Sequence, residues 1–169
     1  MRRIAALLAL ALAALLSGCF ASDRPMFSPA SAVPALGGGG RYATFEVDQG
    51  REKPSDPIAV RLGAAGAYDF INEKGHATPV TFHPIAGGLH VAQVKLDGDQ
   101  GYGYLVVRVS GNGMLVIPAE CARQDKAKME ALGVVQRNQY ECRIDKVADP
   151  AAFFAGLAFS SPVSRMARE

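Results

Sequence analysis

The chain has 169 residues, of which 49% are hydrophobic, and its 18 Lys and Arg against 16 Asp and Glu give a formal net charge of +2. This length predicts one ordinary domain with room for a real core. A charge so close to balance, with no basic stripe, argues against nucleic acid as a partner.

The first eighteen residues have the features of an export signal. Arg2 and Arg3 follow Met1, and residues 4–16 are drawn only from Ile, Ala and Leu. This apolar run is shorter than the roughly 20 residues that a membrane-spanning helix needs. It therefore predicts a secretory signal peptide over residues 1–18. Without that peptide the basic residues fall to 16 and balance the 16 acidic ones.

The signal ends in a specific motif. Leu16-Ser17-Gly18-Cys19 resembles the lipobox of bacterial lipoproteins. The resemblance implies that Cys19 becomes the lipidated first residue and that its acyl chains hold the protein on a membrane. Because Phe20 follows instead of aspartate, it implies the periplasmic side of the outer membrane, with the inner membrane and the cell surface left open. The alternative is a secreted protein with an incidental cysteine.

Residues 19–40 differ in composition from the rest of the chain. They are rich in Ser, Pro, Ala and Gly and end in the run Gly37–Gly40. A stretch that buries little apolar surface predicts a flexible tether between the lipid and the domain. Residues 41–169 are then expected to form a single domain.

From Arg41 onward, short segments of alternating apolar and polar residues are separated by glycine-containing turns. This pattern predicts a mainly β domain, in which an antiparallel meander forms a small barrel or sandwich. The predicted strands cover residues 42–47, 58–62, 67–71, 78–85, 89–96, 102–109 and 114–117.

The turns also predict a register, with Leu96 opposite Tyr102 and Phe82 opposite Val91. Side chains then alternate between two faces of the sheet. The expected core face carries Val80, Phe82, Leu89, Val91, Leu105, Val107, Val109, Met114 and Val116. The opposite face carries His83, His90, Tyr102, Tyr104 and Arg108, among others, and is either covered by the C-terminal segments or used as a binding face.

The last third of the chain predicts two short helices and one more strand. Residues 125–132 have an acidic N-cap and a glycine stop, and Asp149-Pro150 begins a second helix in the favoured order. Residues 140–144 are expected to form a strand. Residues 160–169 are polar and are expected to fray.

Cys121 and Cys142 are the thiols that remain if Cys19 is lipidated. In an exported protein such a pair predicts a disulfide. A metal site would need a different spacing of ligands, and two free buried thiols are the other alternative.

The candidate site residues each have a structural alternative. His83 and His90 could share a metal across the sheet, but no third ligand is identifiable, so we expect neither metal nor cofactor. Tyr102 and Tyr104 could form an aromatic contact surface of the kind used for carbohydrates and peptides, or could pack in the core.

For function, the sequence predicts a protein that is not an enzyme, because it has no Gly-x-Ser-x-Gly, His-Glu-x-x-His or Walker pattern. We expect a binding or interaction module in the periplasm, with the membrane and an envelope protein or glycan as partners. The alternatives are a carrier of a small apolar ligand inside a barrel and a hydrolase with dispersed catalytic residues.

Overall fold

The computed structural model describes residues 20–98, 100–138, 141–144 and 146–169. The signal peptide and Cys19 lie outside the described residues, so the lipidation of Cys19 stays a prediction. Within the described part of the chain, no helix has the length and apolar character to cross a membrane.

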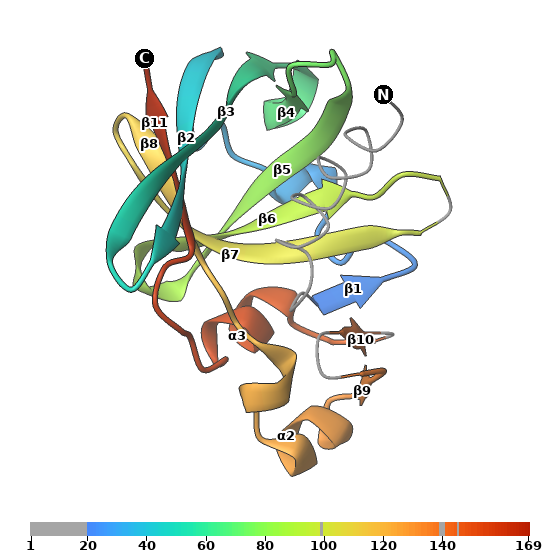
Figure 1. The fold of residues 1–169 in the computed structure, drawn as a ribbon. Coiled ribbons are helices and arrows are strands. Elements are labelled where there is room, and N and C mark those ends of the chain that lie inside the picture. Colours follow the sequence, from blue (N-terminus) through green and yellow to red (C-terminus); the bar gives the residue numbers. More distant parts are fainter. Residues whose placement is uncertain (1–19, 99, 139–140, 145) are drawn as a thin grey trace.

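Eight strands close into an antiparallel barrel (Figure 1). Their order is β6, β5, β4, β3, β2, β11, β8 and β7, and β7 pairs again with β6. The prediction of a mainly β fold is confirmed, and of the two expected architectures the chain forms the barrel. The barrel strands are β2 (Gly40–Asp48), β3 (Arg51–Leu62), β4 (Ala67–Ile71), β5 (Ala77–Ile85), β6 (Leu89–Lys95), β7 (Tyr102–Ser110), β8 (Gly113–Ile117) and β11 (Ser164–Arg168).

The last strand, β11, closes the barrel. Met166 lies opposite Thr44 of β2 on one side and Met114 of β8 on the other, and it exposes 7% of its surface. The prediction that residues 160–169 fray is therefore wrong. One apolar side chain directed into the barrel, together with backbone pairing on both sides, orders this polar segment.

Aromatic and branched side chains fill the barrel. Tyr42, Tyr68 and Phe82 each expose 1% of their surface or less. The Tyr68 hydroxyl accepts a hydrogen bond from the Leu36 N–H at 3.2 Å and donates one to the Gly37 carbonyl at 2.8 Å, which fixes the chain before β2 against this core. The buried members of the interior are Leu36, Tyr42, Val60, Tyr68, Val80, Phe82, Ala92, Val94, Val107, Met114, Val116 and Met166.

The register between β6 and β7 differs from the predicted one by one residue. Lys95, and not Leu96, lies opposite Tyr102. Leu96 already belongs to the loop, where its N–H donates to the Gly101 carbonyl at 3.0 Å. Gly101 has a φ of +83°, and a Cβ there would lie 2.2 Å from the Ser22 carbonyl oxygen. A close approach of the N-terminal strand therefore shapes this turn, and no hairpin rule includes that contact.

The same difference recurs between β5 and β6, where Phe82 lies opposite Ala92 and not Val91. Because side chains alternate along a strand, β6 is turned over relative to the prediction. Leu89 and Val91 lie in the outer core, not in the barrel interior. The two differences cancel for β5, so Val80 and Phe82 point into the barrel as predicted.

Three short strands extend the sheet beyond β7. β1 (Phe20–Ser22) pairs antiparallel with β7 and parallel with β10 (Cys142–Ile144), and β9 (Val134–Gln136) pairs with β10 at the end of the sheet. In Figure 1 these strands lie below the barrel, close to the short helices.

The prediction of a flexible tether over residues 19–40 is wrong for its described part. Phe20, Phe27 and Leu36 expose only 1%, 7% and 4% of their surfaces. Their burial offsets the entropy that is lost on ordering the Ser- and Pro-rich residues between them. We refer to residues 20–36 as the N-terminal segment.

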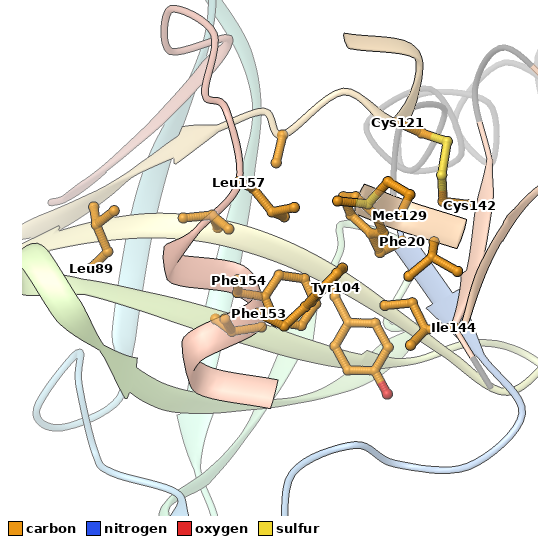
Figure 2. Packing of buried hydrophobic residues seen from close by; sticks show 14 of the residues in the cluster. Phe20, Leu89, Tyr104, Cys121, Met129, Cys142, Ile144, Phe153, Phe154 and Leu157 are labelled. Carbon is orange, nitrogen blue, oxygen red and sulfur yellow. A yellow bond between two sulfur atoms is a disulfide. The ribbon is translucent and has the colours of Figure 1, made fainter. Parts of the chain in front are cut away.

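A second core lies on the outer face of the barrel beside α3 (Pro150–Ala155). Figure 2 shows Phe153 and Phe154 of this helix next to Tyr104, and Phe154 is fully buried. The opposite face of the sheet is thus covered, one of the two predicted outcomes. Its buried members are Phe20, Phe27, Leu89, Val91, Tyr104, Val106, Ile117, Ala119, Cys121, Met129, Val134, Cys142, Ile144, Phe153, Phe154 and Leu157.

Both predicted helices are present and begin at their predicted caps. The Asp149 carboxylate accepts a hydrogen bond from the Ala152 N–H at 3.0 Å at the start of α3. Asp125 accepts one from the Lys128 N–H at 2.9 Å at the start of α2 (Lys126–Ala131). Four single turns complete the structure: η1 (Pro29–Ser31), η2 (Ala64–Gly66), η3 (Ala86–Gly88) and η4 (Cys121–Arg123).

Candidate functional site

The five residues predicted as a possible binding face do not form one surface. His83 and Tyr104 are buried, Tyr102 packs partly buried against the outer core, and Arg108 is exposed farther along β7. His90 lies on the other side of the sheet from His83, because of the register of β6. The expected cross-strand pair of His83 and His90 is therefore wrong.

His83 belongs to the surface on which the N-terminal segment packs. Its imidazole is stacked on the Phe27 ring, with the ring centroids 4.5 Å apart and 16° between the planes. Its Nδ1 lies 2.9 Å from the Ser31 hydroxyl and its Nε2 lies 2.8 Å from the Thr81 hydroxyl. Burial lowers the pKa of His83 to about 4, and a hydrogen bond with the Ser31 backbone opposes that shift only in part. The ring is consequently neutral at pH 7.

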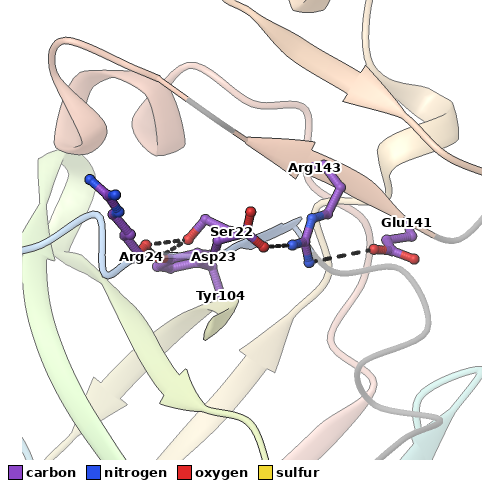
Figure 3. Close-up of polar contacts among 6 residues, drawn as sticks. All are labelled: Ser22, Asp23, Arg24, Tyr104, Glu141 and Arg143. Carbon is purple, nitrogen blue, oxygen red and sulfur yellow. Dashed lines mark hydrogen bonds and ion pairs between the residues drawn. The ribbon is translucent and has the colours of Figure 1, made fainter. Parts of the chain in front are cut away.

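Tyr104, on β7 and two strands away from His83, holds the same segment (Figure 3). Its hydroxyl lies 2.6 Å from the Ser22 hydroxyl and accepts a hydrogen bond from the Met26 N–H at 3.0 Å. Burial raises the pKa of Tyr104, and the bonds from Ser22 and Met26 reduce that shift. The hydroxyl thus serves the structure and is not available to a ligand.

Two further polar contacts fasten the N-terminal segment. The Gln93 side chain on β6 accepts a hydrogen bond from the Phe27 N–H at 3.0 Å. Arg143 of β10 forms ion pairs with Asp23, just after β1, and with Glu141 (Figure 3). The N-terminal segment therefore covers His83 and Tyr104, two of the residues of the predicted binding face.

The disulfide between Cys121 and Cys142 is confirmed, with the two Cα atoms 5.6 Å apart. It joins η4 to β10 and so closes a small region that we call the edge lobe, made of η4, α2, β9 and β10. Figure 2 shows the disulfide at the margin of the outer core, near Met129 and Phe20.

The edge lobe contains a cleft of about 500 Å³. Its buried lining is apolar and comes from Cys121, Met129, Val134 and Cys142. Polar side chains, including Gln124 and Gln136, line its exposed part. A hollow with an apolar floor and a polar rim has the general character of a site for a small ligand or a side chain of a partner.

Among the described strands, β9 pairs with β10 alone and so presents an unpaired edge beside this cleft. Arg137 N–H donates to the Glu141 carbonyl at 2.9 Å, and in an antiparallel pair the bonded positions alternate. Val135 therefore directs its backbone groups toward β10, whereas Val134 and Gln136 direct theirs away from it. Of these two residues Gln136 is exposed and Val134 is buried. Val135 also exposes 51% of its surface, the highest value among the large exposed hydrophobic residues of the described chain.

Few features of the sequence predict this region. Gly133 predicts the end of a helix, but the three residues of β9 are too few to show the alternation that predicts a strand. Their pairing depends on β10 and on the disulfide, which come later in the chain. Only the Val134-Val135 pair, both β-branched, was available as a signal.

The described part of the chain offers little else that could form a ligand site. A second hollow, of about 30 Å³, lies at the junction of β1, β7 and β8 and includes Phe20 and Val163 in its lining. No three His, Cys, Asp or Glu side chains among the described residues are grouped so that they could hold a metal ion. Comparison of the chain with protein-family models, with curated proteins and with solved structures finds no match.

Proposed function

We propose that the protein is a lipid-anchored lipoprotein of the bacterial outer membrane that binds an envelope partner through the edge lobe, without catalysis. The anchor is supported by the sequence, in which Leu16-Ser17-Gly18-Cys19 follows an apolar signal. The binding role is supported chiefly by one observation, the unpaired edge of β9 beside an apolar cleft.

The chemistry of this edge favours an extended protein segment as the partner. A closed barrel has no free strand edges. Where a sheet does end in a free edge, proteins usually protect it, because unpaired N–H and C=O groups can pair with another strand. Here the barrel closes but the sheet continues through β1 and β10 to β9. A partner strand would bond the outward backbone groups of the exposed Gln136, and one of its side chains would enter the cleft.

The alternatives fit the described structure less well. A carrier of an apolar ligand requires an empty interior, whereas Tyr42, Tyr68 and Phe82 fill this barrel. A hydrolase requires a residue of shifted pKa in a polar cleft. The histidines whose pKa values burial lowers, His83 and His90, do not line the cleft of the edge lobe.

A photo-crosslinking amino acid at Val135, in the full-length protein in intact cells, tests the binding role. We expect a crosslink to one envelope protein. Gln136→Pro should abolish it, because proline removes the outward N–H and places its ring on the edge. Gln136→Ala is the matched control, since it keeps the N–H and should keep the crosslink.

Three outcomes contradict this assignment. A crosslink that survives Gln136→Pro would mean that β9 does not pair with the partner. A product that contains glycan and no protein would point to the other class of partner. Equal labelling from Asn112, an exposed residue in the turn between β7 and β8, would show that the capture is not specific. The anchor is tested separately: labelled palmitate should mark the wild type and not Cys19→Ser.

A further inference from the structure

The start of the described chain is built into the sheet. Phe20 lies opposite Tyr104 of β7 on one side and Cys142 of β10 on the other, and it exposes 1% of its surface. Its ring packs edge-on against Phe153 and Phe154, with centroid distances of 5.4 and 5.9 Å. The first residue after the predicted cleavage site and lipidated cysteine is therefore a core residue.

This placement leaves no chain that could act as a spacer. Cys19 is joined to Phe20 by one peptide bond, which sets their Cα atoms about 3.8 Å apart. We infer that the bilayer lies directly against the barrel, at the surface beside the start of β1. This inference rests on the lipid anchor of the proposed function. The anchor thus fixes the orientation of the domain as well as its location.

The surface beside Phe20 is apolar, as contact with a bilayer requires. Leu105, Pro118 and Val163 line the small hollow next to Phe20. Val163 exposes 38% of its surface and is one of the few large hydrophobic residues of the described chain that are so exposed. Apolar side chains at this position gain contact with the headgroup boundary when the acyl chains insert.

The N-terminal segment is held too firmly to supply a spacer by coming loose. β1 is paired on both of its edges, and Tyr104, Gln93 and His83 fasten the residues that follow. Detaching it would expose the buried rings of Phe20 and Phe27 to water. The acyl chains therefore act on the folded domain through a rigid connection.

Exposed positions near Phe20 and far from it are available for a test. Asn112 is exposed in the turn after β7, and the end of that strand, Ser110, lies five residues beyond Leu105, which corresponds to about 17 Å in extended strand. Val163 is the near position, and the exposed Ser161 is a second one in case Val163→Cys does not fold. The disulfide and the lipid leave an introduced cysteine as the free thiol for labelling.

The experiment uses the full lipidated protein in vesicles of phosphatidylethanolamine and phosphatidylglycerol with nitroxide on the headgroups. A fluorophore on Val163→Cys or Ser161→Cys should be quenched several-fold more strongly than one on Asn112→Cys. Inserting about ten Gly and Ser residues between Cys19 and Phe20 creates the missing spacer and should remove the difference.

The outcomes separate the orientation from the anchor. A preparation whose N-terminal peptide carries the lipid mass but whose near and far labels are quenched equally overturns the orientation alone. A difference that persists with the inserted linker also overturns it, because the rigid connection would then not be its cause. An N-terminal peptide without lipid overturns the anchor and the orientation together.

Discussion

The Phe27 ring lies flat on the His83 imidazole, and through this stack the N-terminal segment is fixed to the outer face of β5. The two hydroxyls of Ser31 and Thr81 complete the surroundings of the ring. A buried imidazole placed in this way stays neutral, and its protonation opposes folding. The stability of the protein should therefore depend on pH in the mildly acidic range.

We expect the free energy of unfolding to fall as the pH is lowered from about 6.5 to about 4. The folded pKa of His83 is lowered to about 4 from the ordinary 6.5, so the unfolded chain binds the proton first. The contribution of neutral His83 to the free energy of unfolding is thus fully present above pH 6.5, and about 2 to 3 kcal/mol of it is lost between pH 6.5 and pH 4. Urea unfolding at several pH values measures this slope.

His83→Gln provides the test of cause, because glutamine does not titrate. The variant should be less stable at pH 7, through loss of the stack, but its stability should change less with pH than that of the wild type. Burial also lowers the pKa of His90, so a shallower slope of the same sign should remain. His76→Gln, at an exposed position, is the control, and an unchanged slope in His83→Gln would contradict the assignment.

Tyr104→Phe should loosen the N-terminal segment without unfolding the barrel. The change leaves the Met26 N–H without its acceptor, and a partly buried bond of this kind contributes about 1 to 2 kcal/mol. Hydrogen exchange should show faster exchange at residues 22–27 than in the wild type. Tyr102→Phe, the same change two residues away on β7, is the matched control, and equal protection in both variants would exclude the role given to the Tyr104 hydroxyl.

Met166→Ala should destabilise the whole barrel, because Met166 is the apolar side chain with which β11 closes it. Truncation of a buried Met to Ala costs about 2 to 5 kcal/mol. Ser164→Ala, on the same strand, should change stability by less than about 0.5 kcal/mol. Thermal unfolding compares the two. If Met166→Ala melted like the wild type, the C-terminal strand would not be a part of the core.

Removal of the disulfide should act on the edge lobe first. Replacing Cys121 and Cys142 by serine frees a loop with a sequence separation of 21 residues, for which the chain-entropy model gives about 3 kcal/mol. Reductant should lower the stability of the wild type to that of the double variant and leave the variant unchanged. A wild type that is indifferent to reductant would contradict a structural role for this bond.

The local patterns of the sequence predicted most of the barrel. The alternation in residues 67–71 gave β4 with its observed bounds, and the glycine turn after Ser110 gave the observed pairing of Val107 with Val116. The caps at Asp125 and Asp149 gave both helices. In each case neighbouring residues alone decide the structure, so a reader of the sequence has the necessary information.

What the sequence could not give depends on contacts between distant segments. The turn between β6 and β7 is shaped by the carbonyl of Ser22, which lies 79 residues before Gly101. Phe20 and Phe27 are isolated apolar residues in a stretch typical of linkers, and their burial requires β7, β10 and α3 to be in place. The edge of β9 likewise depends on β10. The features that the sequence did not predict belong more to the candidate site than to the barrel, because the site lies where distant segments meet.

The parallel pairing of Phe20 with Cys142 also imposes an order on biogenesis. The strand β1 cannot complete its hydrogen bonds until nearly the whole chain is available, since β10 is among the last strands in the sequence. Under the proposed lipid anchor, signal removal and acylation have their opportunity before β1 docks between β7 and β10.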